Sequence, residues 1–519
     1  MERRRVGARR RGRHRGLLEL LADNSTGVVG QFGQARTDGL AHGAAGYVTD
    51  SGGIDLADAQ TGQYPHLATL KLSNLLNSPL LGNVGLGNTL SDVSDLEVEV
   101  GAVAGEAELE ACAEAWGAET AQQAVAASTA EDIVAGLERR YLAASADLTF
   151  TSLAAGALAE GLDTLLGQVQ SVTSGLIGQN GVKAGVESGV AALLNGLIST
   201  PLLSLGSITL NTLTATIDLA PTRALVNTPF SDSGGVVAID ARHGTVLIDT
   251  SALLQQAYPE GVGEGLNGLP PNTNLLADPA ILTALTQSLT TALTEWLGHI
   301  ETSLVSAVDR IQISSTLSVN LRARLLSITP FIDVGHIAVT VSGTLADLRV
   351  NTPGTVTAEL QLLGGLLSGL TDLLTKGVLK PVIDLLLVTL VGGTGGVIGG
   401  VVTGVLPAVT ALPTRFAGVT GTLLSLVSRL YTGLFLSNIV TITVNAQNAP
   451  ASGGPPPPDW APGQPTAPPA GRYEVAAIRV GVLDGLGPNG VRLYLGRASV
   501  GPGCSAARAA QPGSPCAAY

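Results

Sequence analysis

Charged and aromatic side chains, lysine and methionine are all scarce in this sequence. Charged residues make up 13% of the 519 residues and aromatic residues 3%, and the chain has one methionine and four lysines. Because an average soluble domain carries about 25% charged residues, the core must be built mostly from aliphatic side chains. The Lys-poor, Met-poor and Gly-rich composition is typical of a protein from a bacterium with a GC-rich genome.

Basic residues are also scarce outside the N-terminus. The net charge is −13, although eight of the 28 basic residues lie between Arg3 and Arg15. The rest of the chain has 20 basic against 40 acidic residues, and such a surface repels the phosphate backbone of DNA or RNA. We therefore expect no nucleic-acid partner.

The N-terminal residues lack a typical secretion signal. Such a signal needs an apolar run of about 7–15 residues, whereas residues 17–22 form a short run that Glu19 interrupts. We interpret residues 1–22 as a disordered basic head. We expect residues 1–16 to be a misplaced start, in a version of the chain that is missing its export signal.

Cysteine is nearly absent from the sequence. Cys112 is isolated, while Cys504 and Cys516 lie close together in the tail over residues 503–519, which we expect to be disordered. Their proximity in sequence allows a local disulfide between Cys504 and Cys516, of the kind that exported proteins often form.

Proline, in contrast, is concentrated in one segment. Nine prolines lie between Pro450 and Pro469, and a stretch with so few apolar side chains favours an extended polyproline conformation. We predict a stiff or disordered linker over residues 450–471. It would separate an α+β body, residues 23–449, from a β-hairpin tail over residues 472–502.

Long alternating segments predict strands that are buried on one face only. In Ile311–Leu325 the apolar residues share one parity and the polar residues the other, which gives a core face and a wet face. The alternation slips near Asn211, where it predicts a β-bulge. Further strands are predicted at 206–219, 236–242, 245–250, 336–350, 439–446, 473–483 and 491–500.

Helical patterns lie between these strands. Asp278 is a candidate N-cap followed by Pro279, and apolar residues recur at helical spacing as far as Val308. Further helices are predicted at 153–178, 183–199, 360–376 and 414–436. The order of helix and strands recurs weakly, about every 100 residues. We predict an α+β fold of antiparallel sheets with long amphipathic helices packed on them, in an elongated and multi-lobed body.

Residues 385–406 contain no charged side chain over a length that is sufficient to cross a bilayer. They are also rich in glycine, and the cluster at 392–396 favours a turn between two buried helices. We prefer buried helices to a membrane span here.

Two Asp-Ser-Gly-Gly segments, at 50–53 and 232–235, are the strongest candidates for catalysis. The second resembles the nucleophile loop of serine proteases, in which glycine amides beside the serine stabilise an oxyanion. Ser231 and Val236 replace the expected glycine and proline, however, and no histidine has the expected context. We interpret both segments as turns that lead into strands.

Metal and nucleotide motifs are absent from the sequence. The histidines show neither HExxH nor zinc spacing: His14, His42, His66, His243, His299 and His336. An acidic run could attract calcium, but its members alternate with apolar residues like the polar face of a strand: Asp92, Asp95, Glu97, Glu99, Glu106, Glu108 and Glu110. No P-loop lysine or dinucleotide-binding glycine motif has a suitable context. We predict no catalytic residue, no cofactor and no metal site.

Several segments together resemble the choice-of-anchor G family of actinobacteria, with a similarity that covers about residues 20–502. The segments are Gly27–Arg36 (GVVGQFGQAR), Ala44–Leu56 (AAGYVTDSGGIDL), Asp95–Val103, Ala144–Leu148 and Arg497–Pro502. The resemblance implies an exported protein of the cell envelope, in a family named for its varied C-terminal sorting signals. It implies no catalytic residues.

The chain departs from that family at both ends. Members are expected to begin with a signal peptide and a further stretch before the segment that matches Val28. The nearest approach to a sortase motif, LPPNT at residues 269–273, is internal, and neither an apolar helix nor a basic tail follows Pro502. The mode of attachment therefore stays open.

These observations favour a non-enzymatic, secreted or cell-surface protein with a structural or adhesive role. Its expected partners are components of the cell envelope or of extracellular surfaces. The alternative is a carrier of a lipid or another apolar ligand, held in a groove between amphipathic helices and aliphatic sheets. A serine hydrolase built on Ser233 is the third hypothesis.

Overall fold

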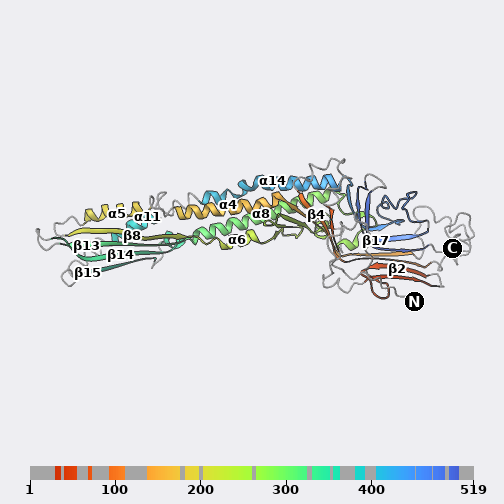
Figure 1. The fold of residues 1–519 in the computed structure, drawn as a ribbon, viewed down its shortest axis with the longest axis horizontal. Helices are drawn as coiled ribbons and strands as arrows, with labels where there is room; N and C mark the ends of the chain where they lie inside the picture. Colours follow the sequence, from red (N-terminus) through yellow and green to blue (C-terminus); the bar gives the residue numbers. More distant parts are fainter. Residues whose placement is uncertain are drawn as a thin grey trace, which may run out of the picture. The chain divides into compact units, whose positions relative to one another are not determined.

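The structure is a computed structural model of the chain. It describes residues 30–36, 40–54, 68–72, 93–110, 137–175, 182–197, 203–259, 265–323, 330–350, 355–362, 380–391, 405–450, 452–469, 471–484 and 490–501. The chain divides into unit 1, which comprises residues 1–156, 230–293 and 419–519, and unit 2, which comprises residues 157–229 and 294–418. Antiparallel sheets and helices make up both units, so the predicted α+β class is confirmed (Figure 1).

Unit 1 contains three antiparallel sheets. Sheet I has the strand order β1-β2-β5-β6: Gly30–Ala35, Leu40–Gly46, Val103–Glu110 and Leu137–Ala143. Sheet II has the order β3-β4-β7-β11-β10-β9: Ala68–Lys71, Val93–Val100, Ala146–Ser152, Thr245–Ile248, Val237–Asp240 and Phe230–Ser231. Sheet III has the order β12-β16-β17-β18: Thr273–Asn274, Val440–Gln447, Tyr473–Val482 and Val491–Val500.

The chain passes from sheet II to sheet I and back through one shared corner. The corner lies between β4 and β5 on the way out and between β6 and β7 on the return. Gly101 N donates to Ser145 O at 3.2 Å, and Ala144 N donates to Ala102 O at 2.9 Å. These two bonds keep the four strands in register across the bend.

Sheets I and III pack face to face around a small apolar core. Its buried members are Ala107, Leu109, Val475, Ala498 and Val500. Glycine is required where the two backbones come closest, because a Cβ on Gly105 would lie 2.1 Å from Gly496 O. The small side chains of this interface therefore allow β5 and β18 to approach one another closely.

Unit 2 is built on sheet IV, with the order β15-β14-β13-β8: Val356–Leu362, Ile332–Thr344, Gln312–Ala323 and Leu203–Thr216. Helices α5 (Val182–Leu197) and α11 (Lys380–Val391) pack on one face of this sheet (Figure 1). Leu317 and Val339 from the sheet and Val190 from α5 are buried between them.

Three of the four boundaries between the units lie within helices: α4 (Leu153–Gly175), α8 (Pro279–Asp309) and α14 (Leu412–Leu430). The predicted N-cap of α8 is confirmed, since Ala280 N donates to Asp278 Oδ1 at 2.9 Å. The shorter helices are α6 (Ala220–Asn227), α7 (Thr250–Ala257), α9 (Leu345–Arg349) and α13 (Leu406–Thr410), with a 3-10 turn at Gly265–Gly268 and a π turn at Tyr431–Phe435.

Candidate functional site

The Pro-rich segment is ordered against sheet III instead of forming the expected linker. Trp460 is 3% exposed, and its ring stacks on that of Tyr494 with 4.6 Å between the centroids. The guanidinium of Arg497 lies over both rings, at 5.2 Å and 5.0 Å. We call residues 452–469 the Pro-rich strap. The strands on either side of it, β16 and β17, pair with each other, so the hairpin tail belongs to the same sheet as β16.

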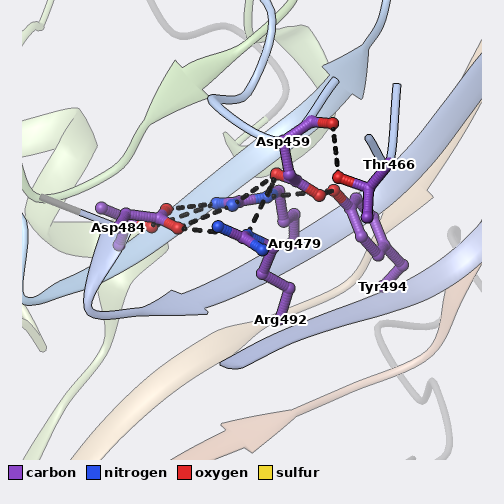
Figure 2. Close-up of polar contacts among 7 residues, drawn as sticks. Asp459, Thr466, Arg479, Asp484, Arg492 and Tyr494 are labelled. Atoms are coloured by element: carbon purple, nitrogen blue, oxygen red, sulfur yellow. Dashed lines mark hydrogen bonds and ion pairs between the residues drawn. The ribbon is translucent and has the colours of Figure 1, made fainter. Parts of the chain in front are cut away.

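A buried charge network fastens the Pro-rich strap to sheet III (Figure 2). Arg479 of β17 is fully buried, and its Nη2 donates to Asp459 Oδ1 of the strap at 2.8 Å. Its Nη1 donates to Asp484 Oδ2 at 2.5 Å. Arg492 is the second cation, with Nε 3.5 Å from Asp459 Oδ1, and the Tyr494 hydroxyl donates to Asp459 Oδ2.

The charges in this network stabilise one another. Burial opposes the ionised forms of Arg479 and Asp484, but the hydrogen bond and attraction between them outweigh it. The pKa of Arg479 is therefore raised and that of Asp484 lowered. Burial and the hydrogen bond to Asp459 raise the pKa of Tyr494. Two cations face two carboxylates, so the charges balance, although Arg492 Nε reaches these carboxylates only at ion-pair distances of 3.5 Å and 3.7 Å. We therefore assign the network a structural role.

The second Asp-Ser-Gly-Gly segment forms a turn that leads into β10, which agrees with the turn interpretation. Val237 N donates to Asp232 Oδ1 at 2.8 Å, and Gly234 N donates to Asp232 Oδ2 at 3.2 Å. Gly235 has a φ of +68°, a conformation that glycine adopts without strain. The aspartate thus binds its own backbone, and Ser233 is exposed beside it.

The acidic run divides between two sheets. On β4 of sheet II, Lys71 Nζ lies 2.7 Å from Glu97 Oε1, and Thr149 Oγ1 donates to Glu99 Oε1 at 3.3 Å. This part is the polar face of a strand, as predicted. Glu106 and Glu108 lie instead on β5 of sheet I, where His42 of β2 joins them, a neighbour that no spacing in the sequence indicates.

The other described histidines are separate from this cluster. His243 Nδ1 lies 2.7 Å from Asp240 Oδ2 in the turn after β10. His299 lies on α8 and His336 on β14. His14 and His66 lie outside the described residues.

The apolar-carrier hypothesis requires a large cavity. An apolar cavity of about 20 Å³ lies in unit 1 between sheet II and the adjoining parts of α7, α8 and α14, where Phe150, Leu253, Leu285 and Tyr431 are among the lining residues. That volume is sufficient for about one water molecule, whereas pockets for small-molecule ligands have volumes of about 300–1,000 Å³. This cavity offers no room for a lipid.

In the described part of the chain, no helix is both long enough and apolar enough to cross a membrane. Of the segment 385–406, residues 385–391 belong to α11, while residues 392–404 lie outside the described residues. The head, Cys112 and the pair Cys504 and Cys516 also lie outside them, so the predicted disulfide stays a prediction.

Sheet IV presents an extensive polar surface, which is a candidate binding surface. Its face opposite α5 and α11 carries mostly hydroxyl and amide side chains, which we call the hydroxyl face. The members are Ser207, Thr209, Asn211, Thr214, Thr216, Gln312, Ser314, Thr316, Ser318, Asn320, Thr340, Ser342, Thr357 and Gln361. The alternation of Ile311–Leu325 predicted this wet face, and β13 lies at its centre.

Cross-strand hydrogen bonds organise the hydroxyl face. Asn211 Nδ2 donates to Ser318 Oγ at 2.7 Å, and Asn320 Nδ2 donates to Ser207 Oγ at 2.8 Å. The bulge predicted at Asn211 is confirmed by a register shift in the pairing of β8 with β13. These bonds restrict the rotamers of the polar side chains before a ligand binds. The loss of side-chain entropy on binding is therefore smaller.

Comparison with known proteins places these features within one family domain. A family model described as a domain of unknown function, DUF8394, matches residues 11–501. No curated protein and no solved structure matches the chain. The matched residues include both the Pro-rich strap and the hydroxyl face.

Proposed function

The chain belongs to the DUF8394 family, and we propose that it is a non-enzymatic, secreted or cell-surface protein that adheres through its hydroxyl face. The partners would be components of the cell envelope or of extracellular surfaces. The observation that carries this proposal is the contrast between the two faces of sheet IV. One face is covered by α5 and α11, and the other presents mostly neutral donors and acceptors to solvent, with Glu359, Arg322 and His336 among them.

The geometry of the hydroxyl face suits an extended and repetitive partner. Strands lie about 4.8 Å apart, and side chains on one face recur about every 6.8 Å along a strand. The face therefore offers a regular grid of hydroxyl and amide groups, which bind by short-range hydrogen bonds more than by electrostatic steering. The resemblance to the choice-of-anchor G family supports an envelope location for such a surface.

Export is tested by shaving intact source cells with protease and identifying the released peptides by mass spectrometry. We expect peptides from both units in the shaved fraction or the culture medium, and none from a cytosolic control protein. Recovery of the protein only after lysis would refute the surface location.

Adhesion is tested with the variant Thr209→Glu, which places a charge on the hydroxyl face. The matched control is Thr302→Glu, which changes a threonine on α8 that is also exposed. Binding of the labelled proteins to isolated cell envelopes should weaken about tenfold, or about 1.4 kcal/mol, for Thr209→Glu and stay at the wild-type level for Thr302→Glu. Equal binding by all three proteins would show that another surface is responsible.

A further inference from the structure

We propose that His42, Glu106 and Glu108 of sheet I form a binding site for one divalent transition-metal ion. They offer one imidazole nitrogen and two carboxylate oxygens, and these ligand atoms all lie within 4.8 Å of one another. Ligands bound at about 2.0–2.2 Å around a tetrahedral ion lie about 3.3–3.6 Å apart. The three groups are therefore close enough to share an ion after small adjustments of their rotamers.

The strand register brings the three side chains together. In the antiparallel pairing of β2 with β5, His42 lies opposite Glu108 and Ala44 lies opposite Glu106. Residues two apart on a strand point to the same face, so both glutamates share a face with His42. The opposite face of sheet I carries Ala107 and Leu109, which pack against sheet III.

A buried nitrogen without a hydrogen bond points to a missing ligand. His42 Nε2 is shielded from solvent and has no hydrogen-bond partner, although it lies 3.0 Å from Glu106 Oε1. The Glu106 residue is itself only 7% exposed. Leaving a buried polar atom unsatisfied costs about 1–3 kcal/mol. An ion bound between the imidazole lone pair and the carboxylate would satisfy both groups.

The charges around the cluster also favour a cation. Arg140 of β6 lies opposite Glu106, and its Nη2 donates to Glu138 Oε2 at 2.7 Å. Its side chain is 63% exposed, and the hydrogen bond to Glu138 and the charges of Glu106, Glu138 and Glu108 raise its pKa. One exposed cation is thus shared among three carboxylates, which leaves the cluster carboxylates with a net negative charge. A divalent ion would neutralise them, as carboxylates in metal sites commonly require.

The imidazole is held in place by aromatic packing. The rings of Phe32 and His42 lie 5.0 Å apart between centroids. Gly52, in the first Asp-Ser-Gly-Gly segment, packs so closely on Phe32 that a Cβ there would lie 2.3 Å from the ring. The turn thus packs against Phe32, and Phe32 packs against His42, which limits the orientations of the imidazole ring.

The ligand chemistry selects the class of ion. A nitrogen ligand favours Zn²⁺ or Mn²⁺ over Ca²⁺, which takes six to eight oxygen ligands. Three protein ligands leave at least one position for water. The proposed site uses only two carboxylates of the acidic run, which was expected to form the polar face of a strand, and a histidine from another strand.

The test uses the full chain, stripped with chelator and titrated with ZnCl₂ or MnCl₂ by calorimetry, with the bound metal counted by mass spectrometry. We expect one equivalent of metal, and at least a tenfold loss of affinity in both His42→Ala and Glu108→Gln. The control is His243→Ala, which removes an exposed histidine that pairs with Asp240, and it should bind like the wild type.

Co²⁺ titration of the wild-type protein tests the ligands without relying on a variant that could misfold. Absorption bands of Co²⁺ bound to histidine are expected to reach their full intensity at one equivalent. Adding one equivalent of Zn²⁺ should displace the Co²⁺ and remove these bands. Three results would overturn the proposal: no binding by the wild type, retained affinity in a folded His42→Ala protein, or loss of affinity in His243→Ala instead. The first of these would indicate that His42 and Glu106 form a simple ion pair.

Discussion

Replacing Arg479 by leucine should destabilise unit 1 strongly at neutral pH. Arg479 is fully buried and binds both Asp459 and Asp484. Without it, two buried carboxylates retain only Arg492 as a cation. Breaking a buried ion pair by removing one partner costs about 3–5 kcal/mol, because the remaining charge stays desolvated. We expect a loss of this size in the free energy of opening of sheet III.

Hydrogen exchange of the amides in β17 and in residues 452–469 measures that free energy locally. The expected loss corresponds to an increase in exchange of at least two orders of magnitude for amides protected by this packing. The control is Arg322→Leu, which removes the exposed pair between Arg322 and Asp333 and should cost about 1 kcal/mol or less. A loss below 1 kcal/mol for Arg479→Leu would refute the reasoning.

The pH dependence provides an independent check of the same network. The folded-state pKa of Asp484 is lowered because Arg479 outweighs the effect of burial. Its contribution to stability is therefore fully present above the unfolded pKa of about 3.9 and is lost as pH falls through the lower folded pKa. The difference between wild type and Arg479→Leu should shrink below about pH 4. A difference that grows on acidification would contradict the assignment.

Two further predictions concern packing and a buried carboxylate. Gly105→Ala should lower the free energy of unfolding, measured in urea, by about 1–3 kcal/mol, because the new Cβ would clash with Gly496 O. The control is Gly33→Ala, whose Cβ would have no atom within 4 Å, and it should be nearly neutral. Burial, and after it the charge of Asp249, raises the pKa of Asp147 to about 6. The contribution of Asp147 to stability is therefore fully present below the unfolded pKa of about 4 and is lost as pH rises through 6. Asp147→Asn should therefore raise the free energy of unfolding by about 1–2 kcal/mol at pH 7.5 and leave it unchanged at pH 4, after allowance for partial exposure; an equal effect at both pH values would refute this assignment.

Sequence periodicity predicted elements that a single pattern determines, and failed where two patterns compete. The alternation of Ile311–Leu325 corresponds to β13, Gln312–Ala323. The strand expected to continue to residue 350 ends at Thr344, because Thr344 and Asp347 form a capping box that begins α9. The helix expected from residue 360 begins inside β15, whose pairing with β14 extends to Leu362. Residues 363–376 of that predicted helix lie outside the described residues.

The candidate metal ligands could not have been found from local spacing. His42 and Glu108 become neighbours only through the register of β2 on β5, and no motif in the sequence encodes that register. The hydroxyl face, by contrast, follows directly from the period of two in its strands. The period of two therefore predicts which side chains share a face of one sheet, whereas contacts between strands that are distant in the sequence depend on a register that it does not contain.

The Pro-rich strap illustrates how composition can mislead about order. Nine prolines in twenty residues predict a segment that does not pack into a core. This composition gives no weight to two individual residues, Asp459 and Trp460, which are both 3% exposed. A sharper signal lies in β17, where Arg479 interrupts a strand that is otherwise mostly apolar. A buried arginine needs carboxylate partners, and β16 and β18 on either side offer none at that position. The partners had to come from the connections on either side of β17. Asp484 follows β17 closely, and Asp459 is the one acidic residue between β16 and β17. A second carboxylate for Arg479 from the preceding connection therefore requires the Pro-rich strap to return to the sheet.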